Sequence, residues 1–306
     1  MHPNSLARFN ALAAWCRFGP TMWILDEVAW FESSDGHLLG LVVRDRTDGD
    51  FLGIYLAKDR VERFRRISQT DAFFDTAEAA AAALVAGAPG LLARLEAERR
   101  QGNEGPAPVD FFRLEVPRER LHPSFAMLLD SEGFSPARAI VGAMMRWYND
   151  VDGNFIEQFQ TGGFDARLLE LYAYALLVEN SFSLSREHAA PDFLAEDILG
   201  TIAVEVTTVN PTQDRQGNPQ PPPEINTSEE RRAYLKHYIP IKFAAALTRK
   251  LGKAYWALPH VAGKPLVFAI QDFHAAGSMT FARSGLINTC TATSTTRTTT
   301  RTASSW

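Results

Sequence analysis

The chain has 306 residues, with 31 Lys and Arg against 36 Asp and Glu, a formal net charge of −5, and 46% hydrophobic residues. These proportions are typical of a folded globular protein and exclude a globally disordered chain. The mildly acidic balance also excludes a general, charge-driven coat for nucleic acid, although it leaves room for a local basic groove. Two cysteines, Cys16 and Cys290, are too few for a disulfide framework and favour a reducing cytoplasm.

No stretch of the sequence suits a membrane span. The longest apolar run, residues 79–93, is interrupted by Gly87, Pro89 and Gly90 and is shorter than the roughly 20 residues that a span needs. The N-terminal segment has no basic region followed by an apolar block, so a secretory signal is not expected. We therefore expect a cytoplasmic protein.

The first third of the chain predicts a small antiparallel meander with helices. Three runs rich in branched and aromatic residues are expected to form its strands: 22–31, 37–45 and 51–59. Asp-Gly pairs between them suit tight hairpin turns. Gly, Pro and polar residues then predict a linker at 101–108, which closes an N-terminal module at 1–105.

A helix is also expected in this module from Thr76 onward. The segment Gly87-Ala88-Pro89-Gly90 should break that helix, because proline lacks a backbone donor and glycine disfavours a helix interior. A second helix is expected to resume at Leu91.

The second module, 110–285, predicts a central mixed sheet flanked by helices. The expected helices are about 123–131, 135–148, 164–179, 228–238 and 240–257. The expected strands are 181–187, the β-branched run 200–211 and the apolar run 265–273. A Pro- and Asn-rich loop is expected at 210–228. The whole chain is therefore predicted to be an α/β (α+β) protein.

The last residues, 286–306, are almost all Thr, Ser, Arg and Ala, with no apolar period that could pack on the rest of the chain. A disordered tail is one interpretation of this segment. A frameshift in the gene is another, because other amino acids would follow from the same codons in a shifted register. The protein sequence leaves both interpretations open.

Three acidic residues stand out in the second module. Glu170 lies on an apolar predicted helix, Asp192 follows a proline, and Glu205 interrupts a β-branched strand. An unpaired charge in such a strand is very unfavourable, so Glu205 should be protonated, ion-paired or bound to a metal.

The order of these residues resembles the core of the PD-(D/E)XK nucleases, also called the restriction-endonuclease-like fold. In this chain Pro191-Asp192 is followed by twelve residues and then by Glu205-Val206-Thr207. The resemblance covers about residues 160–275 and implies a metal-dependent nuclease that hydrolyses nucleic-acid phosphodiesters. The layout of the whole chain also resembles a bacterial family of unassigned function.

The resemblance implies a magnesium or manganese ion held by Asp192, Glu205 and the carbonyl of Val206. Hard cations prefer such oxygen ligands, and a bound metal makes water a better nucleophile. Glu170 is then expected to support the catalytic water from its helix.

The pattern departs from the superfamily at Thr207, where its members carry a lysine. A cation at that point stabilises the attacked phosphate. Some members of the superfamily take the lysine from a neighbouring helix, and in this chain Lys242 and Lys250 are the candidates for that lysine. Thr207 otherwise indicates that catalysis has been lost.

A basic stretch supports a phosphate-bearing partner. Residues 231–264 contain eight Lys and Arg and no Asp or Glu, with Tyr234, Tyr238, Tyr255 and Trp256 among them. Lys and Arg contacts to phosphate dominate nucleic-acid affinity, and aromatic rings stack on bases. The expected nucleic-acid-binding residues are Arg231, Arg232, Lys236, Arg249 and Lys253. DNA is favoured over RNA as the partner.

Each of these features also has a structural interpretation. Glu170 suits an ion pair with Arg167 on a helix surface, Asp192 suits a turn that caps an amide, and basic helices are often only solvated faces. Two other functions therefore stay open: a catalytically silent nucleic-acid- or protein-binding module of the same fold, and a structural or interaction protein.

Overall fold

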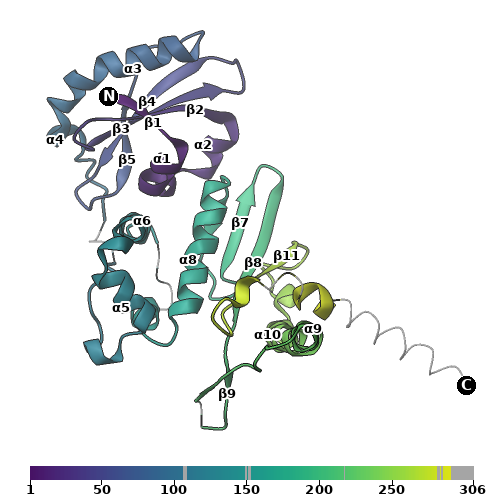
Figure 1. The fold of residues 1–306 in the computed structure, drawn as a ribbon. Helices are drawn as coiled ribbons and strands as arrows, with labels where there is room; N and C mark the ends of the chain where they lie inside the picture. Colours follow the sequence, from purple (N-terminus) through teal and green to yellow (C-terminus); the bar gives the residue numbers. More distant parts are fainter. Residues whose placement is uncertain are drawn as a thin grey trace, which may run out of the picture. The chain divides into compact units, whose positions relative to one another are not determined.

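The computed structural model of the chain describes residues 1–105, 109–148, 150, 153–216, 218–280, 283 and 285–290 (Figure 1). The chain divides into two compact units. The first comprises Met1–Arg167, Leu171–Ala189 and Leu194–Thr201, and the second comprises Leu168–Glu170, Ala190–Phe193 and Ile202–Trp306. Within the described ranges, no helix is both long and apolar enough to cross a membrane.

The predicted meander is present in the first unit as a five-stranded antiparallel sheet with strand order β1-β2-β3-β4-β5. Its strands are β1 (His2–Asn4), β2 (Leu25–Glu32), β3 (Leu38–Asp45), β4 (Phe51–Lys58) and β5 (Phe64–Gln69). The two strands that the sequence did not indicate, β1 and β5, form the sheet edges. β5 carries Arg65 and Arg66, and such charged side chains are typical of edge strands.

Helices cover both faces of this sheet. They are α1 (Leu6–Ala13), α2 (Gly19–Ile24), α3 (Ala77–Leu92) and α4 (Leu95–Glu98). Phe9 and Ala13 of α1 share a core with Leu39 and Leu41 on one face. On the other face of the sheet, α3 packs on the strand side chains that point away from α1. The alternation along the strands therefore builds two cores around one sheet.

Helix α3 continues through Gly87 and Pro89, so the break predicted there is wrong. Ala80, Leu84, Ala88 and Leu91 form one buried stripe that lies against the sheet on both sides of the proline. The packing of this stripe outweighs the single helical hydrogen bond that the proline removes.

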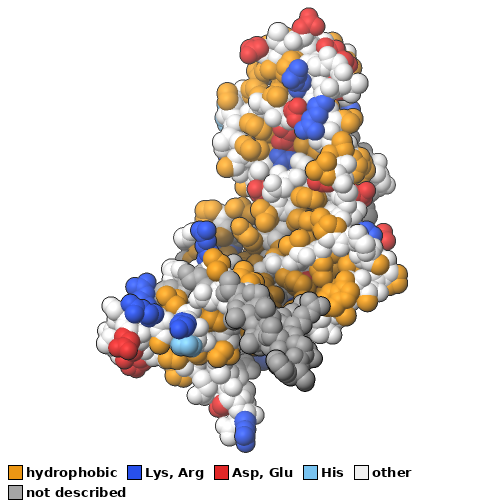
Figure 2. Space-filling model, turned by 90° about the vertical axis from the view of Figure 1, so that its right-hand side faces the viewer, with side chains coloured by type: hydrophobic (Ala, Val, Ile, Leu, Met, Phe, Trp, Pro, Cys, Tyr) orange, Lys and Arg blue, Asp and Glu red, His pale blue; other side chains and the backbone are white. Residues whose placement is uncertain are grey.

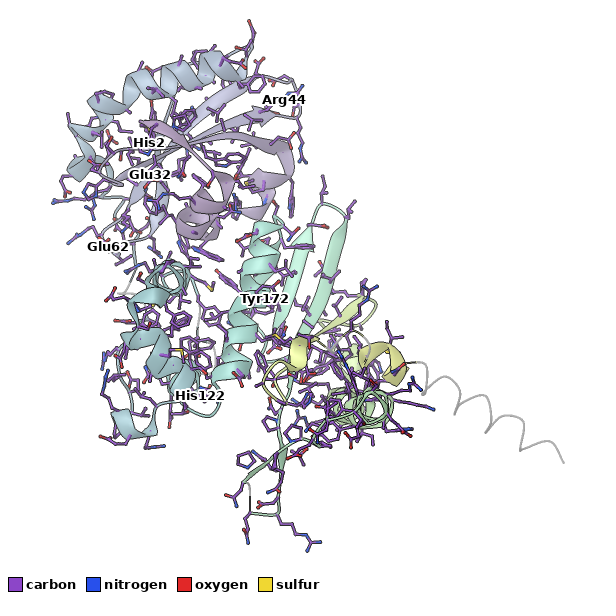
Figure 3. The ribbon with its side chains drawn as sticks, in the orientation of Figure 1. His2, Glu32, Arg44, Glu62, His122 and Tyr172 are labelled. Carbon is purple, nitrogen blue, oxygen red and sulfur yellow. The ribbon has the colours of Figure 1, made fainter. Side chains whose placement is uncertain are left out.

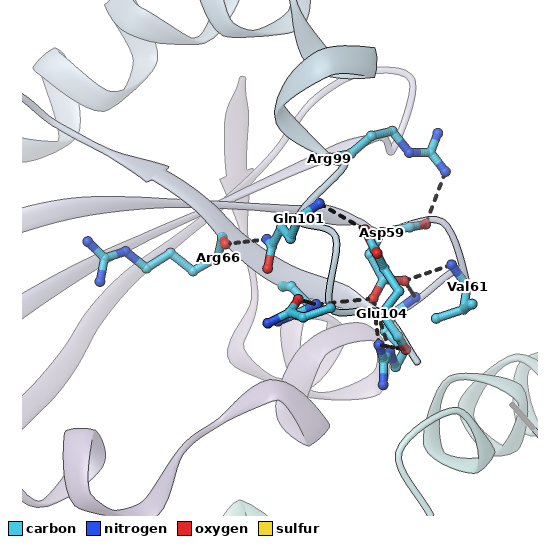
Figure 4. Close-up of polar contacts among 9 residues, drawn as sticks. Asp59, Val61, Arg66, Arg99, Gln101 and Glu104 are labelled. Atoms are coloured by element: carbon cyan, nitrogen blue, oxygen red, sulfur yellow. Dashed lines mark hydrogen bonds and ion pairs between the residues drawn. The ribbon is translucent and has the colours of Figure 1, made fainter. Parts of the chain in front are cut away.

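The first part of the predicted linker is tied to the meander (Figure 4). Arg63 donates a hydrogen bond to the carbonyl of Glu104 (2.6 Å), and Gln101 donates one to the carbonyl of Arg66 (2.8 Å). The start of the linker therefore belongs to the first unit, and residues 106–108 lie outside the described residues.

Four helices follow the linker: α5 (Pro123–Asp130), α6 (Ser135–Met145), α7 (Phe155–Gln160) and α8 (Phe164–Glu179). Aromatic side chains fill the space between the first three of them, with Phe159 5.4 Å from Phe125 and 6.0 Å from Phe111 between ring centroids. His122, labelled in Figure 3, stacks on Phe164 at 5.1 Å. Most of these residues belong to the first unit, whereas the predicted modules, 1–105 and 110–285, divide the chain at the linker.

The second sheet has strand order β11-β8-β7-β6. Its strands are β6 (Ser183–Ser185), β7 (Phe193–Asp197), β8 (Gly200–Val209) and β11 (Leu266–Asp272). β11 runs parallel to β8, whereas β6 and β7 are antiparallel to each other. The sheet is therefore mixed, as predicted. β7 lies directly after the Pro-Asp pair, in a segment for which we predicted no strand.

The Pro-rich loop at 210–228 contains a short hairpin of β9 (Thr212–Gln213) and β10 (Pro219–Gln220). Helix α9 (Ser228–Ala233) then begins with a capping box, and a π-helical turn (Tyr234–Tyr238) joins it to α10 (Ile239–Leu251). The helix predicted to reach 257 ends earlier because the chain turns at Gly252 and Ala254, which has a positive φ.

Residues 285–290 are helical, with Thr289 buried. Most of the predicted disordered or frameshifted tail, residues 291–306, lies outside the described residues. The predicted fold class is confirmed: an α+β protein with an antiparallel meander and a mixed sheet, both flanked by helices. The likeness to the restriction-endonuclease-like fold stays a prediction.

The close packing of α3 on β4 predicts opposite effects of alanine at two glycines of the same helix. A Cβ on Gly87 would lie 2.5 Å from the hydroxyl of Tyr55, which is buried and donates to the Leu84 carbonyl (2.7 Å). We expect Gly87→Ala to lower the free energy of unfolding by about 1–3 kcal/mol, the usual effect of overpacking.

Gly90→Ala is the matched control, because nothing lies within 4 Å of its added Cβ. It should keep or raise stability, by up to about 1 kcal/mol of helix propensity. Urea unfolding of both variants measures the difference, and equal stabilities would contradict the packing described.

Candidate active site

Strand β8 is covered on both faces, and every residue from Ala203 to Val209 is buried. The Ala203 N–H donates to the Pro265 carbonyl (2.8 Å), and the Val209 carbonyl accepts from Phe273 (2.9 Å), so these groups face the β11 side. Because backbone groups alternate along a strand, both the N–H and the carbonyl of Val206 face the opposite edge. β8 is thus an internal strand, and Glu205 is 3% exposed.

Helix α10 lies over the face of β8 from which Glu205 and Val209 project. Phe243 and Ala246 of α10 pack in one cluster with Val209. Phe243, Ala246 and Lys250 have the i, i+3, i+7 spacing of residues on one helix face. Lys250 therefore lies on the same, buried face of the helix as the other two. This spacing directs the Lys250 side chain toward the strand.

The carboxylate of Glu205 is held by two donors. Lys250 Nζ forms an ion pair and hydrogen bond with Oε1, and the Tyr255 hydroxyl donates to the same oxygen (2.6 Å). Burial and the hydrogen bond to Glu205 raise the pKa of Tyr255, so its hydroxyl stays protonated as a donor. The structure thus brings Lys250 and Glu205 together, and adds Tyr255, which we had considered only as an aromatic for stacking.

Asp192 lies beside the same strand from the other edge. Its Oδ2 accepts a hydrogen bond from the Val206 N–H (2.7 Å), fourteen residues along the chain. The Asp192 carboxylate therefore does accept a hydrogen bond from a backbone amide, as the structural interpretation expected. That amide lies in strand β8, however, and not in the turn that contains Asp192. The Val206 carbonyl, predicted as a metal ligand, points toward this same edge.

Glu170 completes an acid cluster, by which we mean Glu170, Asp192 and Glu205. Glu170 is 4% exposed, so it does not lie on an open helix surface. Tyr172, two residues along α8, is 63% exposed and marks the solvent side of the helix (Figure 3). All three acids belong to the second unit.

The acids interact electrostatically. The pKa of Asp192 is raised to about 6, first by burial, then by the charge of Glu205, and to a smaller extent by that of Glu170. The Val206 N–H and the charge of Lys250 act in the opposite direction without cancelling the rise. One lysine therefore does not neutralise the cluster.

This charge balance fits a divalent cation. The carboxyl groups of Asp192 and Glu205 lie near one ammonium group, that of Lys250, and a doubly charged ion would add positive charge beside them. Asp192, Glu205 and the Val206 carbonyl offer the oxygen ligands that Mg²⁺ and Mn²⁺ prefer. Among the described residues, no three or more His, Cys, Asp and Glu side chains form a group that could hold a metal ion, so the predicted ligand set contains only two acids and a backbone carbonyl.

The other predicted residues lie elsewhere in the second unit. Lys242 donates to the Thr212 hydroxyl (3.1 Å), and burial lowers its pKa. Thr207 is buried in β8. The five predicted nucleic-acid-binding residues are exposed on or just after α9, the π-helical turn and α10: Arg231, Arg232, Lys236, Arg249 and Lys253.

A buried polar chain lies at the end of β11. Asp272 binds the Nδ1 of His274 (2.6 Å), and the Nε2 of His274 lies 2.5 Å from the hydroxyl of Tyr234. All three side chains are less than 10% exposed. This chain joins β11 to the π-helical turn and so fixes the start of α10.

Comparison of the chain with family models, with curated proteins and with solved structures finds no match. The proposals below therefore depend on the geometry of the site and on the resemblance of its residues.

The raised pKa of Asp192 predicts that this group opposes folding at neutral pH. Its folded value of about 6 exceeds the ordinary value of about 4, so stability falls as pH rises through that interval. We expect Asp192→Asn to be more stable than the natural chain above pH 6, by up to about 3 kcal/mol, with the difference vanishing near pH 4.

Urea unfolding between pH 4 and pH 8 measures this difference. Glu196→Gln, which changes an exposed carboxylate on β7, is the control and should show no such pH dependence. A difference for Asp192→Asn that is constant with pH would contradict the account.

Proposed function

We propose that the second unit is a metal-dependent phosphodiesterase site that hydrolyses nucleic acid. One observation carries the proposal: Lys250 reaches Glu205 from a helix, beside Asp192, although the strand has Thr207 at the lysine position of the motif. A helix-borne lysine is one of the arrangements that the resemblance allows, and among the two candidates only Lys250 contacts an acid of the cluster.

In this proposal Asp192, Glu205 and the Val206 carbonyl hold Mg²⁺ or Mn²⁺. Bound there, the ion would lower the pKa of a water and balance charge on the phosphate. Lys250 adds a fixed positive charge beside the reacting phosphate, and Tyr255 keeps Glu205 oriented. Glu170 adds a negative charge that favours the cation and disfavours an unmetallated site.

The predicted partner is DNA, bound through exposed cations of α9 and α10. On the face in Figure 2, Lys and Arg side chains form separate groups among hydrophobic and acidic ones. The exposed Arg and Lys side chains of α9 and α10 within the second unit are the proposed contacts to the phosphate backbone. We retain the cytoplasm as the proposed location, because Cys16 and Cys290 are both free thiols.

A second function is favoured by one observation. The Oε1 of Glu205 already accepts from Lys250 and Tyr255, so the carboxylate is satisfied without a metal. A catalytically silent module that keeps the fold and binds nucleic acid or protein would need only this arrangement. Dependence on divalent metal separates the two functions.

The proposal predicts nicking of supercoiled DNA by the full chain in Mg²⁺ or Mn²⁺, and none in EDTA. Lys250→Gln should lower the rate at least about 100-fold, as expected when a charge-stabilising donor is lost. Thr248→Ala is the control from the exposed side of the same helix, outside the predicted DNA contacts, and should retain most of the rate. Salt-sensitive DNA binding without metal-dependent nicking would favour the silent module instead.

The same proposal predicts how the rate depends on pH. Asp192 must be ionised to hold a cation, and its pKa is about 6, so nicking at low metal concentration should increase as pH rises from 5 to 7. Raising the metal concentration should shift the midpoint to lower pH, because the cation competes with the proton. A rate that is insensitive to pH across this interval would contradict a role for Asp192 as ligand.

A further inference from the structure

A hollow of about 450 Å³ lies in the first unit, between helix α6 and the turn that joins β4 to β5. Its charged lining residues are Lys58, Glu62, Arg63, Arg138 and Arg146. All of them belong to the first unit, so the hollow is separate from the acid cluster and independent of the function proposed above. Its volume is in the range of small-molecule sites, roughly 300–1,000 Å³.

One wall of the hollow is a face of α6 with a gap in its middle. Arg138, Gly142 and Arg146 have the i, i+4, i+8 spacing of residues on one helix face. A rise of about 1.5 Å per residue places the Cα atoms of the two arginines about 12 Å apart along the helix. No atom of the described residues lies within 4 Å of a Cβ built on Gly142, so the space between the two arginines is open.

The opposite wall carries two more cations. Lys58, at the end of β4, forms an ion pair with Glu62 (3.3 Å), which is labelled in Figure 3. Glu62 also contacts Arg99 (3.4 Å), so the one acid of the described lining is shared between two cations. Arg63 binds the buried Asp59 (2.9 Å). This wall therefore has no excess of negative charge.

The two arginines of α6 are compensated less than those of the opposite wall. Arg138 donates to the neutral carbonyls of Leu128 (3.0 Å) and Ser131 (2.6 Å), and it lies 3.9 Å from Glu132, whose side chain is 94% exposed. So exposed a pair contributes little. Arg146 is half-buried and has no acceptor or acid partner among the described residues. The surplus of positive charge is therefore greatest along α6, where a ligand in the hollow can reach it.

This surplus and the rest of the lining specify the ligand. Most of the other lining residues are apolar, among them Leu12, Phe112 and Met145. A guanidinium keeps its charge and binds the oxygens of an anion in pairs. A phosphate monoester carries about −1.5 to −2 charge at pH 7, whereas a carboxylate carries one negative charge. A cation would be repelled here, and a purely inorganic anion would leave the apolar side chains without a partner.

We propose that this hollow binds a small organic phosphate, namely a phosphate monoester of an apolar or aromatic group. The phosphate oxygens accept hydrogen bonds from the guanidinium of Arg146 and are attracted by the charge of Arg138. The organic group packs on the apolar part of the lining, in the space that Gly142 leaves open. A nucleoside monophosphate and a simple aryl phosphate share this chemistry.

Calorimetric titration of the full chain with adenosine 5′-monophosphate and, separately, with phenyl phosphate tests the proposal. At least one of the two should bind in a saturable way at millimolar concentration or below. Adenosine and phenol, which lack the phosphate, should bind at least about tenfold more weakly than the corresponding phosphates. Inorganic phosphate should also bind more weakly, because it buries no apolar surface.

Matched variants assign the binding to this hollow. Arg146→Gln should weaken it about tenfold, the effect of losing a charge-assisted hydrogen bond. Arg120→Gln is the control, because Arg120 is an exposed arginine of the same unit outside the lining, and it should leave affinity unchanged.

A second pair of variants tests the open space itself. Gly142→Leu should fill the gap between the arginines and weaken binding at least about tenfold, since a filled hollow excludes the ligand. Gly90→Leu, at another helical glycine with open space around its Cβ but outside the lining, should leave affinity unchanged. Urea unfolding of each variant checks that it is folded.

The outcome identifies the source of the ligand or overturns the proposal. Binding of the nucleotide alone would identify a nucleotide site, and binding of phenyl phosphate, alone or with the nucleotide, a site for aromatic phosphates in general. The proposal is wrong if neither probe binds at millimolar concentration, or if inorganic phosphate binds as tightly as the probes. It is also wrong if Arg146→Gln and Arg120→Gln bind the probes equally well.

Discussion

The ion pair between Lys250 and Glu205 is the interaction on which the candidate active site depends. A carboxylate in the middle of an internal strand is tolerated only when a positive charge and further hydrogen bonds compensate for its burial. Lys250 supplies the charge because it follows Phe243 and Ala246 on the buried face of α10. Tyr255 supplies the second hydrogen bond. The position of α10 on β8 and the two contacts to the Glu205 side chain are therefore parts of one arrangement, and the polar chain from Asp272 to Tyr234 anchors the start of that helix.

The same pair does not neutralise its surroundings. Asp192 and Glu170 contribute two further carboxyl groups, and the pKa of Asp192 is raised first by its burial and then by the charges of Glu205 and Glu170, which Lys250 only partly offsets. A protein that needed only a structural ion pair would gain stability by replacing Asp192 with a neutral residue. In a site that binds a divalent cation, the loss of stability caused by the buried Asp192 carboxylate would be offset when the cation binds. The satisfied Oε1 of Glu205 is the one feature that agrees equally well with a silent module.

Periodicity predicted much of the fold. The meander strands, the main strands of the mixed sheet and helix α8 follow from runs of branched, aromatic and other apolar residues that are bounded by turn residues. The break at Pro89 was wrong because local propensity favoured a break, whereas the apolar stripe of α3 continued across it. In the site, the chemical types of Asp192 and Glu205 were recognisable, but the choice between Lys242 and Lys250 was not made. The spacing of Lys250 from Phe243 and Ala246 favours Lys250 over Lys242, but only once it is known that Phe243 and Ala246 lie on the buried face of α10. Tyr255 was missed as a site residue because it lies beyond the helix end, in a turn whose direction no periodicity specifies.

Titration of the Asp192 carboxyl group by ¹³C NMR, with and without Mg²⁺, tests the central claim most directly. Without metal, the account predicts a midpoint near pH 6, and with Mg²⁺ a lower midpoint as the cation replaces the proton. A midpoint near the ordinary value of about 4 would contradict the buried, uncompensated acid cluster. A midpoint near 6 that Mg²⁺ leaves unchanged would contradict metal binding by Asp192 and leave the silent module as the function of this unit.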